Sequence, residues 1–326
     1  MLLAGDVGGT RTRVGLFARG ESRPAAVDVE VFSTLDFPDL SSLVEEFLRR
    51  SDRTAVVLEG ACFGVAGPVQ GTSARLTNVP WDIDAAAISM RLAVAPVLLL
   101  NDLEAMAWAI PVLAGEDVEI LQPGSPAEDG NAALIAAGTG LGIAMLHHVS
   151  GRLVPMPSEG GHADFAARTP RETALQEALT RQHGRAEREQ VVSGQGLVNI
   201  HRLLHPHPCA AVPANLDPAK APPLISEAAF RHRCPACVET LAMFVSAYGA
   251  AAGDLALTAL STAGLYVGGG IAPKILPALR TAAFLDAFRA KAPMDRLLAR
   301  IPVRVILNPL SGLLGAAAHL NARLSE

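Results

Sequence analysis

Residues 131–146 read NAALIAAGTGLGIAML, and this stretch decides the fold. An apolar run leads into a turn of glycine and threonine and a second apolar run follows, which predicts a β-hairpin with exposed backbone at its tip. The same pattern opens the chain, where residues 2–17 read LLAGDVGGTRTRVGLF. Glycines at both tips leave main-chain N–H groups open to phosphate oxygens, and Thr10 and Thr139 add hydroxyl donors. We therefore predict two hairpins that face each other across a cleft and hold a polyphosphate.

The order of the remaining segments predicts an α/β protein with two similarly built lobes. A chain of 326 residues is long enough for two domains, and strand-like segments alternate with helix-like ones. Beyond the hairpins, strands are expected at 54–58, 61–66, 97–100, 265–267 and 302–307. Helices are expected at 82–92, 103–113, 170–183, 198–204, 227–260 and 312–324, with a proline-rich surface loop at 205–223.

Composition and charge narrow the class of partner. The net charge is −5, aromatic residues make up 4% of the chain and no basic block is present, so nucleic acid is not expected as a partner. We identify neither the basic-then-apolar pattern of a signal peptide nor a run of about 18 apolar residues that suggests a membrane span. We therefore expect a cytoplasmic protein that does not engage a membrane, with four free thiols: Cys62, Cys209, Cys234 and Cys237.

Two common nucleotide-binding motifs are absent. The chain has three lysines, none of which follows a glycine, so a Walker A loop is excluded. The glycine pattern that begins at Gly138 places Ile143 where the dinucleotide fingerprint requires its third glycine. The remaining interpretation is a phosphate-binding site made of the hairpin tips. At residues 138–142 the alternative is an ordinary hairpin turn that binds no phosphate.

Asp6 lies just before the first glycine turn. A carboxylate beside a phosphate loop can hold Mg²⁺ directly or through water, and the alternative is an acidic turn residue with no ligand.

Three glycines at 268–270 follow another strand-like segment, where bare backbone could lie against an adenine ring. The alternative there is a plain turn from strand to helix.

Asn101 and Asp102 carry the predicted chemistry. They follow a short apolar strand, and residues after the C-terminal ends of strands line the crevice of open α/β sheets. A carboxylate at that point can accept the proton of a substrate hydroxyl as the oxygen attacks phosphorus, an effect typically worth ~10²–10⁴ in rate. The alternative is that Asp102 merely caps the helix expected to begin at Leu103.

Two further pairs of side chains are candidates for binding. Glu159 and His162 bracket a pair of glycines and can bind the hydroxyls of a polyol, unless they simply form a solvated loop. A zinc site is not expected there, because no third ligand is in view. Cys234 and Cys237 form a CxxC pair that could be half a zinc site or a redox pair, and the alternative is that they have no special role.

Taken together, these stretches resemble the bacterial glucokinases of the hexokinase type, within the sugar kinase, heat-shock ATPase and actin superfamily. The resemblance covers essentially the whole chain. The phosphate segments of that family match Gly5, Asp6, Val7, Gly8, Gly9 and Thr10, and then Gly138, Thr139 and Gly140. Its adenosine segment matches Gly268, Gly269 and Gly270, and its sugar-binding residues match Asn101, Asp102, Glu159, His162 and Glu189.

The resemblance implies an ATP-dependent kinase that converts D-glucose to glucose 6-phosphate at the entry to glycolysis. It implies that Asp102 is the catalytic base, that Asp6 holds Mg²⁺ through water and that Asn101, Glu159, His162 and Glu189 bind glucose. It also implies a two-lobed, actin-like (ribonuclease H-like) fold with a cleft between a small domain of residues 1–111 plus 303–326 and a large domain of residues 112–302. A homodimer is the implied assembly.

The chain departs from the family pattern at three loop positions, which leave the chemical groups in place. Arg11 replaces an asparagine or lysine, Ser158 replaces a glycine and Gln195 replaces a proline. The Cys-rich zinc motif that follows the loop histidine in the related repressor/kinase family is missing after His162. The competing functions are a kinase for another hexose or an amino sugar, and a sugar sensor or actin-like scaffold that binds ATP without transferring phosphate.

Overall fold

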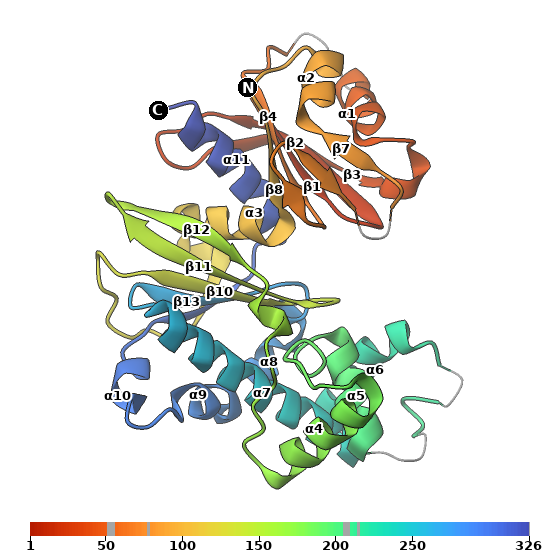
Figure 1. Cartoon of the computed structure of the whole chain (residues 1–326), viewed down its shortest axis with the longest axis vertical. Coiled ribbons are helices and arrows are strands. Elements are labelled where there is room, and N and C mark those ends of the chain that lie inside the picture. Colours follow the sequence, from red (N-terminus) through yellow and green to blue (C-terminus); the bar gives the residue numbers. More distant parts are fainter. Residues whose placement is uncertain (51–55, 77–78, 205–208, 214–215, 326) are drawn as a thin grey trace. The chain divides into compact units, whose positions relative to one another are not determined.

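The chain divides into two compact α/β units, as the computed structural model in Figure 1 shows. The structure describes residues 1–50, 56–76, 79–204, 209–213 and 216–325. The first unit comprises Met1–Gly115 and Asn308–Glu326, and the second comprises Glu116–Leu307.

Five strands form the main sheet of the first unit, in the order β3-β2-β1-β4-β8. The strands β1, β2 and β3 are antiparallel neighbours, whereas β4 and β8 run parallel to β1. Their bounds are Leu2–Val7 for β1, Arg11–Ala18 for β2, Ala25–Ser33 for β3, Gly60–Val65 for β4 and Val97–Asn101 for β8. A small antiparallel sheet adds β5 (Val69–Gln70), β6 (Ser73–Arg75) and β7 (Asp82–Asp84).

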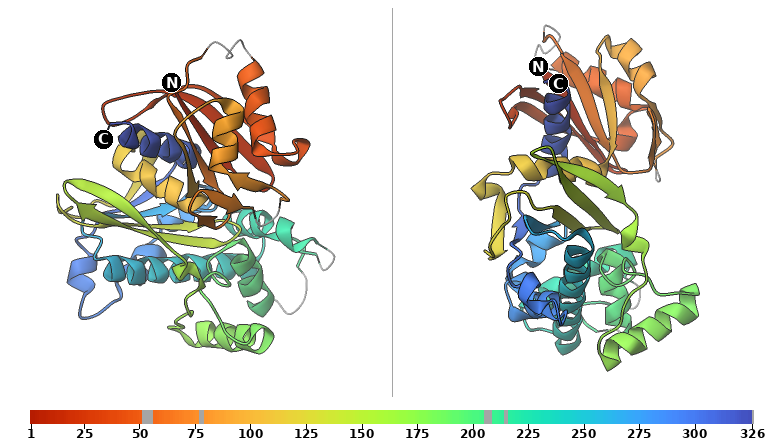
Figure 2. Two further views of the ribbon diagram at one scale, coloured as in Figure 1. Left: turned by 45° about the horizontal axis from the view of Figure 1, so that its top comes forward. Right: turned by 60° about the vertical axis from the view of Figure 1, so that its left-hand side comes forward.

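Helices cover both faces of this sheet (Figure 2). Their bounds are Leu40–Arg49 for α1, Ala85–Leu92 for α2, Asp102–Ala109 for α3 and Ser311–Arg323 for α11, with 3₁₀ turns at Thr34–Asp36 and Ile110–Val112. Alternate residues of β1 enter the two cores: Leu3 packs in the cluster that includes α1, and Leu2 in the one that includes α3 and α11. A Cβ on Gly315 would lie 1.7 Å from the Ala105 carbonyl oxygen, so only glycine allows α11 to pack so closely on α3.

Six strands form the sheet of the second unit, in the order β12-β11-β10-β13-β14-β9. The first five repeat the pattern of the first unit, with an antiparallel β12-β11-β10 meander followed by two strands parallel to β10, and β9 adds an antiparallel edge. The bounds are Val118–Gln122 for β9, Ala132–Ala137 for β10, Leu141–Val149 for β11, Arg152–Ser158 for β12, Gly264–Gly268 for β13 and Val303–Ile306 for β14. This repetition confirms the predicted fold class and both predicted glycine hairpins.

A group of helices packs on this second sheet around one large core. Their bounds are Pro170–His183 for α4, Gly194–Leu204 for α5, Ala221–Phe230 for α6, Pro235–Ala259 for α7, Leu276–Leu279 for α8, Ala282–Arg289 for α9 and Asp295–Leu298 for α10. Single 3₁₀ turns occur at Gly115–Asp117, Gly160–His162, Pro218–Lys220 and Ala272–Ile275.

The helix α7 is the apolar centre of the second unit. Contrary to the sequence expectation, it is long and apolar enough to cross a membrane by length and composition, but 72% of its most apolar stretch is buried inside the protein. Phe244 and Tyr248 are completely buried, and a Cβ on Gly249 would lie 2.1 Å from the Phe284 carbonyl oxygen on α9. The apolar composition of α7 therefore matches its position in a protein core.

Several predicted elements differ from those observed. The helix expected at 227–260 is two helices, α6 and α7, because the chain reverses between them with His232 at a φ of 51°. Residues 56–58 of an expected strand are not strand, and residues 54–55 lie outside the described residues. Residues 303–306, expected in the small domain, form β14, which pairs with β13 and β9 in the second sheet.

Candidate active site

Three parallel strands of the first unit end at one edge of the sheet and bring the predicted catalytic residues together. In the register, Asp6 of β1 is opposite Gly64 of β4, and Gly64 is opposite Leu100 of β8. Asn101 ends β8, and Asp102 begins α3 directly after it. The carboxyl groups of Asp6 and Asp102 are close enough for the charge of one to raise the pKa of the other.

Asp6 is held by a cation that the sequence analysis missed. Asp6 and Arg13 are directly opposite in the β1–β2 hairpin, and the Arg13 guanidinium donates to Asp6 Oδ2 at 3.0 Å. The first turn of α11 closes the other side, since a Cβ on Gly312 would lie 3.5 Å from the carboxyl carbon of Asp6. Burial raises the pKa of Asp6, and Arg13 opposes this rise.

Gly64 allows α3 to approach the sheet at this edge. A Cβ on Gly64 would lie 2.7 Å from the Cβ of Ala105, so any larger residue would push Asp102 and its helix away. Asp102 retains solvent contact, but desolvation by the surrounding protein raises the pKa of its carboxyl group. The N–H of Leu103 opposes that rise, and the negative charge of Asp6 adds to it.

The helix cap, which was the alternative role for Asp102, belongs to Asn101. The helix α3 begins at Asp102, and Asn101 Oδ1 accepts the N–H of Leu103 at 3.0 Å in the N-cap position. Asn101 Nδ2 donates one hydrogen to the Gly67 carbonyl oxygen at 3.1 Å. The Asn101 side chain also hydrogen-bonds the Asp102 carboxyl group, which opposes the rise in the pKa of Asp102.

The first glycine turn is tied to the neighbouring strand. The Gly8 N–H donates to the Arg11 carbonyl oxygen at 3.1 Å, and a Cβ on Gly8 would lie 2.8 Å from the same oxygen. The Thr34 hydroxyl donates to the Gly8 carbonyl oxygen at 2.7 Å, and the Thr34 N–H donates to Thr10. These contacts hold the turn while Thr10 itself stays exposed.

The glycine turn of the second unit is held from two other loops. The Gly138 N–H closes the turn on the Gly140 carbonyl oxygen at 2.8 Å, and the Gly194 N–H at the start of α5 donates to Gly138 at 2.9 Å. The carboxylate of Glu189 accepts the N–H of Leu141 at 2.8 Å. A Cβ on Gly138 would meet nothing within 4 Å, so the outer side of the turn is open.

Glu159 and His162 flank a glycine pair that packs beneath the same hairpin. A Cβ on Gly160 would lie 2.3 Å from the Ile143 side chain, and one on Gly161 would lie 1.8 Å from the Leu141 carbonyl oxygen. Both glycines are therefore required by packing. Glu159 and His162 are exposed, and the Glu159 side chain makes no hydrogen bond to the 3₁₀ turn that it precedes.

Two glutamates compete for the third sugar-binding position in the second unit. Glu189 is bound to the hairpin through Leu141, and its own N–H donates to the Gly161 carbonyl oxygen at 3.0 Å. Glu187 pairs with Arg185 at 2.7 Å and lies 3.3 Å from His162 Nδ1. His162, Glu187 and Glu189 place their potential ligand atoms within 4.8 Å of one another, a proximity that the sequence did not reveal.

The third glycine segment meets the hairpin through a buried tyrosine. Gly269 has a φ of 82°, and a Cβ there would lie 2.4 Å from the Ala137 carbonyl oxygen at the end of β10. The Tyr248 hydroxyl accepts the Ala137 N–H at 3.2 Å and lies 3.3 Å from the carbonyl oxygens of Ile135 and Gly268. One side chain of α7 thus joins the C-terminal ends of β10 and β13.

The structure therefore gathers the predicted site residues into two groups, one in each unit. Asp6, Gly8, Asn101 and Asp102 lie at one edge of the first sheet, and the glycines, Glu159, His162 and Glu189 surround the β10–β11 turn. Arg13, Gly312 and Tyr248 were not among the predicted site residues. The hairpin register could have revealed Arg13, because a turn centred on Gly9 and Thr10 pairs residues 6 and 13.

Two α/β units with the same strand order, each bearing a glycine hairpin, form the two-domain architecture of actin-like sugar kinases. A glucokinase from an Antarctic psychrotroph superimposes with a TM-score of 0.87 at 30% identity, covering 98% of both chains. A ROK family glucokinase from Streptomyces griseus, solved in complex with glucose and AMPPNP, shares the fold with a TM-score of 0.60 at 21% identity, covering 99% of both chains.

Sequence comparison narrows this class to one family. The family model described as Glucokinase matches residues 3–323. A glucokinase from Nostoc punctiforme is 39% identical to this chain, covering 97% of this chain and 98% of its own length. The chain belongs to the glucokinase family.

Proposed function

We propose that this protein transfers the γ-phosphoryl group of ATP to the 6-hydroxyl of D-glucose, with Asp102 as the general base. Membership of the glucokinase family supports the substrates. The observation that carries the catalytic assignment is the carboxyl pair of Asp6 and Asp102 at the ends of parallel strands, where desolvation raises both pKa values and the charge of Asp6 adds to the rise at Asp102. A carboxyl group with a raised pKa is a stronger base than an exposed aspartate.

Asp102 receives the proton in the proposed reaction. As the O6–phosphorus bond forms, the hydroxyl proton passes to the Asp102 carboxylate, while the bond from the γ-phosphorus to the bridging oxygen breaks and ADP leaves. The Asp102 carboxyl group accepts the Leu103 N–H at 2.9 Å and hydrogen-bonds the Asn101 side chain, and these contacts orient it at the end of β8. Because phosphoryl transfer requires little covalent chemistry from the protein, positioning provides most of the remaining acceleration.

Asp6 is the residue that we assign to Mg²⁺. Its Oδ2 is paired with Arg13, which leaves Oδ1 for the metal or for a water on it, and a single carboxylate with several waters is a usual Mg²⁺ environment. When bound, Mg²⁺ neutralises charge on the phosphates. Arg13 opposes the rise that burial causes in the pKa of Asp6, and so favours the carboxylate form that binds a metal.

The glycine segments of the second unit are the proposed contacts of the nucleotide. Gly138 and Gly270 have open space on the side where a Cβ would be, so ligand atoms can approach the main chain there. Gly138, Thr139 and Gly140 are assigned to the phosphates, and Gly268, Gly269 and Gly270 to the adenosine. In the first unit, Gly5 to Thr10 are assigned to the phosphates.

Free hydrogen-bonding capacity supports the assignment of the sugar-binding residues. The Asn101 amide group hydrogen-bonds the Asp102 carboxyl group and so lies beside the proposed base, and Glu159 makes no capping bond. Glu189 uses one oxygen on Leu141 and keeps the other. His162 is exposed beside Glu187, which can hold its imidazole in a fixed orientation. These groups match the donors and acceptors of a sugar.

The decisive experiment replaces Asp102 with asparagine. Asp102→Asn keeps the shape but removes the base, so kcat should fall by at least ~10² while glucose affinity in calorimetry changes little. Glu104→Gln is the matched control, because Glu104 lies on the same helix and its pKa is also raised by burial. Near-normal turnover in Asp102→Asn, or an equal loss in Glu104→Gln, would contradict the assignment.

A second assay separates the competing functions. ADP release is measured without sugar and with glucose, mannose, fructose, N-acetylglucosamine or N-acetylmannosamine. We expect release that depends on sugar and is fastest with glucose. Equal release without sugar would favour an ATPase or sensor, and preference for another sugar would reassign the substrate.

The family resemblance also leads us to propose a cytoplasmic homodimer. Light scattering on the purified chain tests the dimer directly. A mass near 33.9 kDa, that of one chain, would contradict it.

A further inference from the structure

Three cysteines and a histidine from distant parts of the sequence meet at the helical end of the second unit. His201 belongs to α5, Cys209 follows that helix, Cys234 is the N-cap of α7 and Cys237 lies in the first turn of α7. Three of the four are at most 7% exposed, and Cys209 is half-buried. Three of the four cysteines of the chain therefore belong to this cluster, and Cys62 is the exception.

We propose that His201, Cys209, Cys234 and Cys237 form a structural Zn²⁺ site. Cys₃His is one of the ligand sets of structural zinc, and soft thiolates with an imidazole favour zinc over magnesium or calcium. The site is separate from the proposed glucose and ATP contacts and does not depend on them. It also differs from the Cys-rich motif of the repressor/kinase family, because no cysteine lies near His162 in the sequence.

The distances fit a tetrahedral ion. His201 Nε2 lies 3.8 Å from Cys209 Sγ, and the ligand atoms of His201, Cys209 and Cys237 all lie within 4.8 Å of one another. Zn–S bonds of about 2.3 Å and a Zn–N bond of about 2.0 Å at tetrahedral angles place ligand atoms about 3.5–3.8 Å apart. The His201–Cys209 pair is already close to this separation, and the two pairs with Cys237 need to contract by about 1.3 Å at most.

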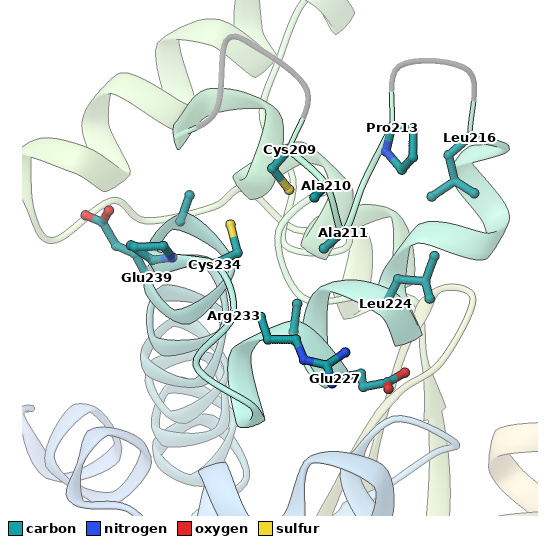
Figure 3. A pocket seen from close by; sticks show the side chains of 13 residues that line it. Cys209, Ala210, Ala211, Pro213, Leu216, Leu224, Glu227, Arg233, Cys234 and Glu239 are labelled. Carbon is teal, nitrogen blue, oxygen red and sulfur yellow. The ribbon is translucent and has the colours of Figure 1, made fainter.

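Cys234 is the proposed fourth ligand, although it is not among the residues whose ligand atoms all lie within 4.8 Å of one another. The Cys234 thiol is within hydrogen-bonding reach of the Cys237 thiol. In Figure 3 the sulfur atoms of Cys209 and Cys234 both point into the space between the two side chains. Two cysteines separated by two residues at the start of a helix are a common half of a zinc site.

The hydrogen bonds of His201 prepare its ring for metal binding. The Thr240 hydroxyl donates to the Ala236 carbonyl oxygen at 2.7 Å, so its oxygen is an acceptor for the His201 ring. His201 Nδ1 lies 3.4 Å from that oxygen, which places the ring hydrogen on Nδ1 and the lone pair on Nε2, facing Cys209. A ligand histidine normally donates its second nitrogen in this way.

An ion can also reach the site from outside. Cys209 and Cys234 line an open pocket of about 940 Å³ together with apolar residues and the charged Arg233 and Glu239 (Figure 3). The ion would join the segment after α5 to the start of α7. The N-terminal end of α5 supports the glycine turn, because the Gly194 N–H donates to the Gly138 carbonyl oxygen. Bound zinc would therefore fix the C-terminal end of the same helix.

The first test measures metal content of the untagged protein by plasma mass spectrometry. We expect about one zinc per chain. Cys209→Ser and Cys237→Ser should lose stoichiometric zinc, whereas the control Cys62→Ser, which alters the remaining cysteine, should retain it. Metal-free protein supplied with Co²⁺ should show the strong visible absorption of a tetrahedral thiolate complex, and the Cys209→Ser variant should not.

Thr240→Val provides a variant that leaves every ligand in place. Loss of the hydrogen bond to His201 should weaken zinc affinity about 10–100-fold, which competition with a chelator measures. In a separate experiment, added zinc should raise the melting temperature of the unaltered protein more than that of Cys209→Ser. The proposal fails if neither purified nor reconstituted protein binds zinc, if Cys209→Ser retains it, or if mass spectrometry finds these cysteines joined by a disulfide. Kinase activity is not part of the readout, so failure here leaves the proposed function unaffected.

Discussion

Replacing Tyr248 with phenylalanine tests how the second unit joins its two nucleotide segments. The Tyr248 hydroxyl accepts the Ala137 N–H at the end of β10 and lies beside the carbonyl oxygens of Ile135 and Gly268. Its ring packs edge-on against Phe244 and Phe284, with centroids 5.9 and 5.8 Å away. Tyr248→Phe keeps this ring packing and removes only the hydroxyl.

The expected cost follows from those contacts. The Ala137 N–H loses the Tyr248 hydroxyl as its acceptor in a fully buried setting, and an unsatisfied buried donor costs about 1–3 kcal/mol. The distances of 3.2 and 3.3 Å are long for such bonds, which favours the lower half of that range. We therefore expect the free energy of unfolding to fall by about 1–2 kcal/mol.

The effect on nucleotide binding has an upper limit set by the same energy. If all of the lost stabilisation appeared in binding, 1–2 kcal/mol would raise the KM for ATP by about 5–30-fold, since about 1.4 kcal/mol is tenfold. We expect a smaller rise, with the KM for glucose unchanged. Burial raises the pKa of the Tyr248 hydroxyl, so the hydroxyl stays protonated and these effects should not depend on pH in the neutral range.

The assay uses the distribution of aromatic residues between the units. Both tyrosines, Tyr248 and Tyr266, lie in the second unit, and both tryptophans, Trp81 and Trp108, lie in the first. In urea, tryptophan fluorescence follows the first unit, and circular dichroism follows both. Tyr266→Phe, on β13 itself, is the matched control. A loss below about 0.5 kcal/mol, or a loss equal to that of the control, would refute the reasoning.

Three further outcomes are expected. Gly161→Ala places a Cβ 1.8 Å from a backbone oxygen, so it should lower the melting temperature and raise the KM for glucose. Gly138→Ala has open space around its Cβ and should leave the melting temperature unchanged. Equal melting temperatures for the two variants would contradict the packing argument. The acid limb of kcat/KM should lie above the ordinary aspartate range, and in the residual activity of Asp6→Asn it should move to lower pH, because Asp6 raises the pKa of Asp102. Finally, a raised pKa of the Asp102 carboxyl group in the folded state stabilises the fold only while the group is protonated, and this stabilisation is lost as pH rises through the folded pKa. Asp102→Asn should therefore not lower the melting temperature at pH 7. Any gain in melting temperature at pH 7 should vanish in acid, as calorimetry would show.

Much of the fold could be predicted because local patterns determine it. The spacing of apolar residues around the glycine turns is enough to form the hairpins β1–β2 and β10–β11, and Pro170 and Gly184 bound α4 with ordinary helix signals. The strand Ala25–Ser33 was not predicted, because it is mostly exposed and has no alternating buried pattern. The helix Leu40–Arg49 was also not predicted, although Asp39 accepts the Ser42 N–H at its N-cap and its apolar residues follow helical spacing.

The candidate site could be predicted in its residue types but not in their partners. Asp102 was expected to cap a helix or to act as a base, and only the observed start of α3 assigns the cap to Asn101. Glu189 was identified by resemblance, but its bond to Leu141 across the hairpin depends on two loops far apart in the sequence. The proximity of His162 to Glu187 has the same origin.

By itself, the sequence determined the glycine turns, the carboxylates placed just after strands and the family, since each of these depends on neighbouring residues or on motif order. The tertiary structure decided which groups share an environment: Asp6 with Arg13 and Asp102, Tyr248 with Ala137 and Gly268, and His201 with the three cysteines. The physical reason is that pKa shifts, buried hydrogen bonds and metal coordination depend on separations of a few ångströms. Chain folding sets those distances between residues that are far apart in the sequence.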